Sequence, residues 1–329
     1  LVERDGELSQ LVRIPFQHEG DPVPVTVHVG DAEPKRLTLE ANQQRLEVTV
    51  PAVDRKTDVR VRVQIPGQES AVRTLTLRPV RKWVVYLLPH SHVDIGYTHV
   101  QTDVEQAQWK YLEMAIDTAR QSAEYPAGAR FKWNVEVLWA VDSYLQQATP
   151  EKRQRFIDAV RAGQIGLQAL YGNQLTGLCR AEELFRLLTC AQRVSRLCDQ
   201  PIRSAMITDV PGYTWGIVPA LAHNGVKYFS VGPNGGDRIG HTSAAWGDKP
   251  FWWIGPNGED KILVWMTGTG YYQVFKSPER LLKYLGGLAK NGYPYDYVQV
   301  GHCLGVNAAP DVNFAVRVKR WNEQCACPR

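Results

Sequence analysis

A change of pattern near residue 83 constrains the fold of this chain more than any other feature. From Trp83 onward, short apolar runs alternate with longer segments in which apolar residues recur at helical spacing. The run at residues 83–88 is continuously apolar, as expected of a strand buried on both faces. Further apolar runs follow at residues 131–135, 165–170, 205–208, 228–231 and 262–265. Repeated strand-then-helix units predict a parallel sheet or a barrel, whose ligands bind at the carboxyl ends of the strands.

Three helices are predicted between these strands. The first follows Thr102, which stands at capping-box spacing from Glu105. The second has Pro150 in its first turn and stops at Gly163, because proline suits the start of a helix and glycine its end. The third covers residues 181–197.

Residues 1–80 differ from the rest in both composition and pattern. They contain no tryptophan, tyrosine or cysteine, whereas all ten tryptophans and all six cysteines lie at or after Trp83. Apolar and polar residues alternate at period two, as at residues 24–29 and 58–65. Such strands, separated by turn residues, predict a small antiparallel β-sandwich. We therefore expect an accessory domain at residues 1–80 and a second domain at residues 81–329.

Charge and hydropathy exclude two classes of partner. The net charge of +4 comes from 38 basic and 34 acidic residues, and no basic cluster is interleaved with aromatic residues, so nucleic acid is not an expected partner. No apolar run approaches the roughly 20 residues that a membrane span requires. The first residue is Leu1 rather than methionine, so we expect the chain to begin inside a longer one. The sequence predicts neither a compartment nor an oligomeric state.

The segment Leu88-Pro-His-Ser-His-Val-Asp-Ile-Gly-Tyr-Thr98 lies just beyond the first buried strand. His90, His92 and Asp94 alternate along it, so in an extended chain their side chains share one face. An imidazole and a carboxylate on one face can bind zinc together. The alternative is that a histidine packs or caps while Asp94 begins a turn with Gly96. The residues alone leave both interpretations open.

Asp209 occupies the same position after a later strand. It follows the apolar run at residues 205–208 and precedes a Val-Pro-Gly turn. At a strand end, its carboxylate would meet the first cluster across the top of a barrel. The alternative is an aspartate that stabilises the turn through its own side chain.

Taken together, the two segments resemble the N-terminal catalytic domain of glycoside hydrolase family 38, the zinc-dependent retaining α-mannosidases. The resemblance covers about residues 83–320. It implies that His92 and Asp94 are metal ligands and that Tyr97 lines the sugar subsite. Asp209 and Gly212 match the family's Asp-x-x-Gly turn, which implies that Asp209 binds the metal and also attacks the sugar. His90 matches a first histidine beside the metal pair and is not assigned as a ligand.

The resemblance implies a fold, a substrate and a cofactor. We expect a seven-stranded β/α barrel-like catalytic domain, C-terminally incomplete, preceded by the small β-sandwich. The expected substrate is an α-mannoside or a mannose-containing glycan, and the expected cofactor is Zn²⁺. Asp209 would form a covalent mannosyl-enzyme, while a second group protonates the leaving oxygen.

The second group and the fourth zinc ligand are not assigned. Relatives carry an acidic residue near the position of Val306, where this chain has none. Asp311 is a substitute candidate, with a turn-forming role after Pro310 as the alternative. The family's fourth ligand is a histidine expected beyond Arg329, and His302 is the histidine nearest the end of this chain.

Two alternative functions and four further candidate site residues follow from the sequence. A metal-dependent polysaccharide deacetylase would need an Asp-Asp pair at the first strand end and a His-x₃-His ligand pair, and the sequence shows neither. A catalytically inactive carbohydrate-binding fragment is the other alternative, which Val306 favours. Glu136 and Asp142 flank an apolar run and could reach a pocket, although a solvated helix face is the default expectation, and Asn173 and Thr176 are candidate sugar contacts.

Overall fold

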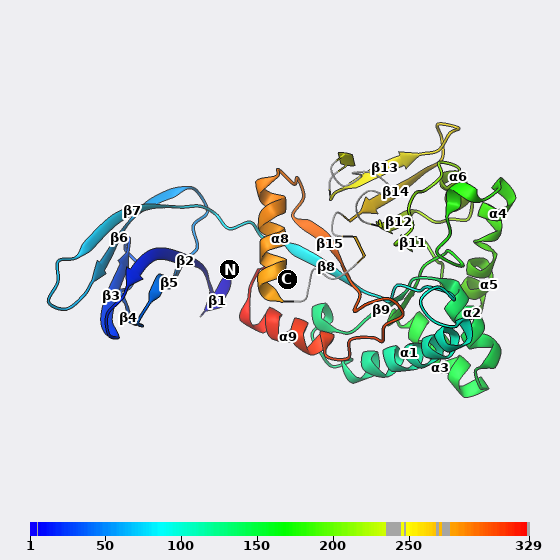
Figure 1. Ribbon diagram of the computed structural model, residues 1–329, viewed down its shortest axis with the longest axis horizontal. Coiled ribbons are helices and arrows are strands. Elements are labelled where there is room, and N and C mark those ends of the chain that lie inside the picture. The colour runs from blue at the N-terminus through cyan, green and yellow to red at the C-terminus, as the bar shows by residue number, and fades with distance from the viewer. Residues whose placement is uncertain (5, 235–244, 247, 268–269, 272–276, 328–329) are drawn as a thin grey trace. The chain divides into compact units, whose positions relative to one another are not determined.

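A computed structural model describes the whole chain except residues 5, 235–244, 247, 268–269, 272–276 and 328–329 (Figure 1). The chain divides into two compact units. The first unit comprises Leu1–Val84 and Arg320–Arg329, and the second comprises Val85–Lys319. The predicted second domain, residues 81–329, differs from the second unit at its end. Residues 320–329 belong to the first unit.

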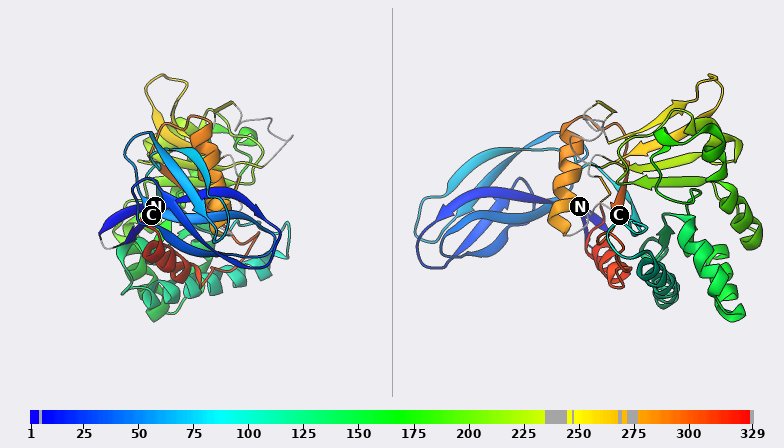
Figure 2. Two further views of the ribbon diagram at one scale, coloured as in Figure 1. Left: turned by 90° about the vertical axis from the view of Figure 1, so that its left-hand side faces the viewer. Right: turned by 45° about the vertical axis from the view of Figure 1, so that its right-hand side comes forward.

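The first unit consists mainly of strands in its described residues, shown in blue to cyan in Figure 1 and from two further sides in Figure 2. They are β1 (Val2–Arg4), β2 (Glu7–His18), β3 (Val23–Val29), β4 (Lys35–Leu39), β5 (Gln43–Pro51), β6 (Thr57–Gln64) and β7 (Ala71–Leu77). One antiparallel sheet has the order β1-β2-β5 and the other the order β4-β3-β6-β7.

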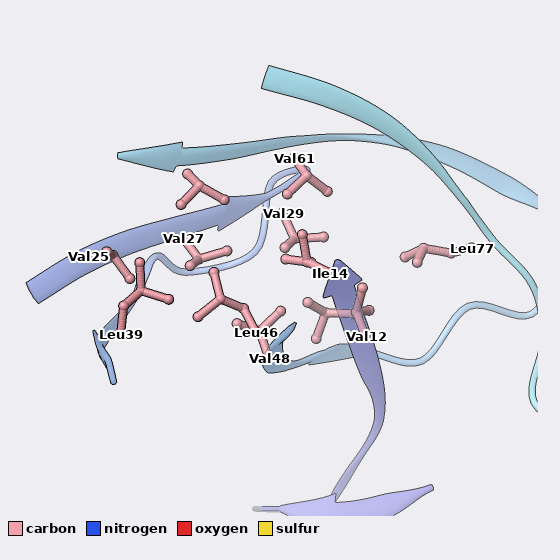
Figure 3. Close-up of a cluster of buried hydrophobic side chains, with 12 residues drawn as sticks. Val12, Ile14, Val25, Val27, Val29, Leu39, Leu46, Val48, Val61 and Leu77 are labelled. Carbon is pink, nitrogen blue, oxygen red and sulfur yellow. The ribbon is translucent and has the colours of Figure 1, made fainter. Parts of the chain in front are cut away.

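Period-two alternation gives this unit its core. Along β3, Val25, Val27 and Val29 are buried while the residues between them are more exposed, because successive side chains point to opposite faces of a sheet. Leu46 and Val48 of β5, from the other sheet, belong to the same buried cluster (Figure 3). The two sheets therefore enclose one apolar core, as in a small β-sandwich.

The second unit alternates strands and helices. Its strands are β8 (Val84–Pro89, which starts at the last residue of the first unit), β9 (Trp133–Val135), β10 (Ile165–Leu167), β11 (Ser204–Thr208), β12 (Tyr228–Gly232), β13 (Pro250–Ile254), β14 (Lys261–Met266) and β15 (Tyr297–His302). Its helices are α1 (Gln101–Gln121), α2 (Leu138–Gln147), α3 (Pro150–Arg161), α4 (Ala181–Arg186), α5 (Thr189–Cys198), α6 (Ile217–His223), α8 (Pro278–Lys290) and α9 (Phe314–Gln324, which ends in the first unit), with short 3₁₀ turns at Ala127–Ala129 and Thr176–Leu178. Together the strands and helices form a mixed α/β fold with several sheets. None of the helices in the described residues combines the length and apolarity that crossing a bilayer requires.

The structure confirms some of the predicted helix boundaries and contradicts others. In α3 the Thr149 hydroxyl accepts a hydrogen bond from the Lys152 N–H, and Gly163 follows with φ of 66°. The capping box predicted at Thr102 is wrong, because α1 starts after Val100, which makes no side-chain cap. The single helix predicted at residues 181–197 is two helices.

The break between α4 and α5 has a tertiary cause. The Leu187 carbonyl accepts a hydrogen bond from the Tyr171 N–H at 3.0 Å. That carbonyl is therefore bonded to another part of the unit at the point where one continuous helix was expected.

The pairing of strands follows a continuous order. β9 pairs in parallel with β10, and β11, β12 and β14 form a parallel sheet with β13 antiparallel at its edge. β8 pairs with β15, a parallel bridge joins His90, just after β8, to Asn134 of β9, and the Ala169 N–H after β10 donates to the Ser204 carbonyl of β11 at 2.8 Å. The order is thus β15-β8-β9-β10-β11-β12-β14. No described pairing joins β14 to β15, so a closed seven-stranded barrel is not confirmed in the described residues.

Candidate functional site

In the segment after β8, burial of Val93 sets the direction in which the neighbouring side chains of His92 and Asp94 point. Val93 packs in a core cluster with Val104 of α1 and Trp139 of α2. His92 and Asp94 lie on either side of Val93 in the chain, so they face away from that cluster. Their side chains meet, with His92 Nε2 3.1 Å from Asp94 Oδ1.

Asp209 reaches the same place from the end of β11. Its backbone φ is 57°, a left-handed conformation that non-glycine residues adopt seldom. Its N–H donates to the Gly232 carbonyl at the end of β12 at 2.9 Å, and the Asn234 amide donates to its Oδ1. Its other oxygen, Oδ2, lies 3.8 Å from His92 Nε2. The three predicted ligands are therefore gathered around one imidazole nitrogen.

These distances can be compared with those of a zinc site. Zinc bonds of about 2.0–2.1 Å place neighbouring ligand atoms of a tetrahedron roughly 3.3 Å apart. The separations of 3.1 Å and 3.8 Å from His92 Nε2 lie on either side of that value. As these side chains stand, however, no group of three or more His, Cys, Asp or Glu residues in the described residues could hold a metal ion. One imidazole and two carboxylates are nevertheless a donor set of the kind that zinc binds.

A buried carboxylate, Glu136, lies behind His92. Glu136 is 1% exposed between β9 and α2, so the default expectation of a solvated helix face is wrong and the alternative of an inward-facing side chain holds. Its Oε1 lies 3.4 Å from His92 Nδ1, and its Oε2 accepts a hydrogen bond from the Val93 N–H at 2.8 Å. Thr208 donates to Glu136 and lies 2.7 Å from His92 Nδ1. A carboxylate behind a histidine is the arrangement that orients metal-binding imidazoles.

The charges of this cluster set its protonation. Burial lowers the pKa of His92, but the hydrogen bond and the charge of Glu136 oppose burial. The charges of Asp94 and Asp209 add to that effect, so the pKa of His92 is raised above its ordinary value. Burial raises the pKa of Glu136, but its contacts with His92 outweigh burial and leave the pKa lowered. The carboxylates therefore favour a positive charge at this imidazole.

The three residues predicted to contact sugar, Asn173, Thr176 and Tyr97, differ in their surroundings. Asn173 supports the His92 cluster from behind, because its Nδ2 lies 3.5 Å from His92 Nδ1 and its Oδ1 accepts from the Thr208 N–H at 3.3 Å. Thr176 is fully buried and accepts a hydrogen bond from the Thr214 N–H at 3.0 Å. Tyr97, in contrast, is 86% exposed on the same loop as Asp94.

His90 and His302 are held by other interactions. The His90 N–H donates to the His302 carbonyl, and burial lowers the pKa of His90. His302 Nε2 lies 3.1 Å from Asp311 Oδ2, and its ring stacks on Phe314 with centroids 4.4 Å apart.

Asp311, the substitute candidate for the acid, is held ionised. Arg317 donates to its carboxylate. Burial alone would raise the pKa of Asp311, but the hydrogen bonds from His302 and Arg317 and the charge of Arg317 hold it well below its usual range. A general acid must carry a proton near neutral pH, so this carboxylate does not suit that role.

Val306 lies where the acid was expected. It forms an isolated parallel bridge with His92 and is half-buried. The structure thus brings an apolar side chain close to the strand end that bears the predicted metal pair.

Comparison with known proteins identifies the family. The chain matches the family described as glycosyl hydrolases family 38 N-terminal domain over residues 82–328, and it belongs to that family. A comparison with curated proteins found no match.

Two solved structures show the same fold. An α-mannosidase from Enterococcus faecalis V583 has a TM-score of 0.56 at 16% identity, over 73% of this chain and 27% of that one. A family 38 glycosyl hydrolase protein from Enterococcus faecalis has a TM-score of 0.51 at 17% identity, over 74% of this chain and 25% of that one. The chain therefore spans about a quarter of the length of these two proteins.

Proposed function

We propose that this chain carries the zinc-binding and nucleophile-bearing part of a retaining glycoside hydrolase that cleaves terminal α-mannosidic bonds. The observation that carries the proposal is the meeting of Asp94 and Asp209, from two separate strand ends, at Nε2 of His92. Family membership and the resemblance of the two motifs support the same chemistry.

Each residue then has a defined task. His92, Asp94 and Asp209 would hold the zinc ion, and Glu136 fixes the orientation of the imidazole. Zinc, when bound, supplies a positive charge that holds the vicinal hydroxyls of the sugar. The Asp209 carboxylate attacks the anomeric carbon as the glycosidic C–O bond breaks, giving a covalent glycosyl-enzyme that water later hydrolyses with retention. Tyr97 offers its exposed ring to a sugar face.

The strand order supports a further proposal about architecture. We infer that β8, β9, β10, β11, β12, β14 and β15 are the seven strands of one barrel-like domain. Apart from the missing β14–β15 pairing, their order is continuous, and Gln299 of β15 donates to the Ser230 hydroxyl of β12 at 2.6 Å. The first unit would serve as an accessory domain.

Metal content tests the proposed site directly. Elemental analysis of purified wild type is expected to give about one zinc per chain, and His92→Ala with Asp94→Ala is expected to lose it. A matched control is His223→Ala with Asp260→Ala, because this pair also lies within 3.3 Å but far from β8 in the sequence. A folded wild type without zinc, or a double variant that keeps it, would contradict the site.

Glu136 provides a finer test. Replacing Glu136 with glutamine is expected to weaken zinc binding about 10- to 100-fold, because a neutral amide no longer stabilises and orients the His92 imidazole. Competition with a chelator measures the change. Glu182→Gln is the control, since Glu182 is 72% exposed and pairs with Arg186 on the surface. Equal zinc affinity in both variants would show that Glu136 only packs.

A second candidate function is carbohydrate binding without turnover. Val306 beside His92 and the ionised Asp311 favour it, since neither can protonate a leaving group. Calorimetric binding of mannose, together with no hydrolysis of an activated aryl α-mannoside, would support this candidate over the enzyme.

A further inference from the structure

Asn307 contacts the predicted metal segment from the other end of the second unit. Its backbone N–H donates to the His92 carbonyl at 2.7 Å. Its side-chain Nδ2 donates to the Asp94 carbonyl at 3.0 Å and lies 3.2 Å from the Thr98 hydroxyl. Asn307, in the loop that follows β15, therefore hydrogen-bonds to the backbone of both His92 and Asp94.

Asn307 is held in an unfavourable state. Its φ is 49°, a left-handed conformation in which asparagine is tolerated better than most residues but glycine best. Its Oδ1 is buried and has no hydrogen-bond partner among the described residues. Strained backbone and unpaired buried polar atoms are both costly, and they concentrate where surrounding contacts require them.

The two costs together indicate what the side chain is for. If only a left-handed turn were needed, glycine would provide it without burying an unpaired amide oxygen. An asparagine instead gains the Nδ2 donor, which is used on Asp94 and Thr98. The side chain, and not only the turn, therefore serves the segment after β8.

That segment needs such support. Val93 is buried in the core cluster, but the chain that follows it runs to the surface. It bends at Gly96, which has φ of 77°, and residues 96–100 are exposed. The Asp94 carboxylate must nevertheless stay within about 0.5 Å of a productive geometry if it is to bind a metal together with His92.

We infer that Asn307 is a positioning residue that holds Asp94 in register with His92 and orders the loop that carries Tyr97. This inference rests on the proposed function of the same site, which it deepens by naming what holds the ligands in place. Asn307 acts through the backbone of Asp94 and touches neither sugar nor metal in this role.

The test uses Asn307→Gly, which keeps the left-handed turn and removes only the side chain. Hydrogen exchange of metal-free protein is expected to become at least about 10-fold faster for the amides of Val93 and position 307, because these amides donate hydrogen bonds where the two segments meet and the side-chain anchor between the segments is lost. Zinc affinity, measured by chelator competition, is expected to fall about 10-fold or more. Asn42→Gly is the control, because Asn42 has φ of 63° but lies on an exposed turn of the first unit.

The two measurements keep the inference separate from the proposed function. Unchanged exchange at Val93 and position 307 in Asn307→Gly would overturn the anchor, whatever the metal does. Faster exchange with unchanged zinc affinity would overturn the positioning of the ligands. If wild type binds no zinc, the proposed function fails, and the inference that Asn307 positions a metal ligand fails with it. Hydrogen exchange still shows in that case whether Asn307 anchors the loop.

Discussion

Replacing Asp209 with alanine is expected to abolish turnover of an aryl α-mannoside and to weaken zinc binding in the same protein. Removing a covalent nucleophile costs about 10⁴-fold or more in kcat. The zinc loss has a separate cause, because Oδ2 of Asp209 and Oδ1 of Asp94 are the two carboxylate oxygens that lie near His92 Nε2 among the described residues. Steady-state kinetics and chelator competition measure the two effects.

Asparagine at the same position separates the two roles. Asp209→Asn keeps the size, an oxygen donor and the tolerance of a left-handed φ, but it loses the charge needed for attack. It should bind zinc better than Asp209→Ala and still lack turnover. Asp199→Ala is the control for backbone strain, since Asp199 has φ of 50° at the end of α5. Wild-type zinc affinity in Asp209→Ala would reject the shared role, and wild-type turnover would reject the nucleophile.

The predictable part of this site follows from one rule. In parallel α/β folds, functional side chains lie at the carboxyl ends of strands, so the positions of His92, Asp94 and Asp209 after apolar runs predicted that they would meet. The structure brings the three together. The same rule applies to Glu136, which directly follows β9 and lies against His92 Nδ1.

Other parts depend on contacts that a local pattern does not contain. Asn307 and Asn173 stand several residues beyond their strands, so only the folded loops show that they reach the His92 segment. The break between α4 and α5 arises because Leu187 bonds to Tyr171, a tertiary contact that helical periodicity cannot reveal. Pairing between strands is likewise a long-range property: the sequence predicted the strand at residues 262–265 but not β15 at residues 297–302, and it gave no strand order.

Replacing Val306 with aspartate is expected to supply a general acid at a position that now carries an apolar side chain. A general acid contributes about 10²- to 10⁴-fold when the leaving group is poor. Val306 pairs with His92 at the strand end and is half-buried. Burial raises the pKa of a carboxyl group, which favours the protonated form that an acid requires.

Two substrates show whether this reasoning holds. Without an acid, the leaving oxygen departs as an anion, so wild type should cleave 2,4-dinitrophenyl α-mannoside far faster than methyl α-mannoside. Val306→Asp should raise kcat/KM for methyl α-mannoside by about 10²-fold or more and change the dinitrophenyl substrate little, because that leaving group needs no proton. Val306→Asn is the matched control, since it has similar size and polarity but no acidic proton.

The pattern of rates also separates the two candidate functions. An enzyme that lacks only its acid retains an intact nucleophile and metal site, so a new acid at position 306 restores a step that was slow. A carbohydrate-binding chain without a working Asp209 gains nothing from the same change. Equal rates for Val306→Asp and Val306→Asn on methyl α-mannoside would therefore reject position 306 as the place of the acid. Failure of all three proteins on the dinitrophenyl substrate would instead favour binding without turnover.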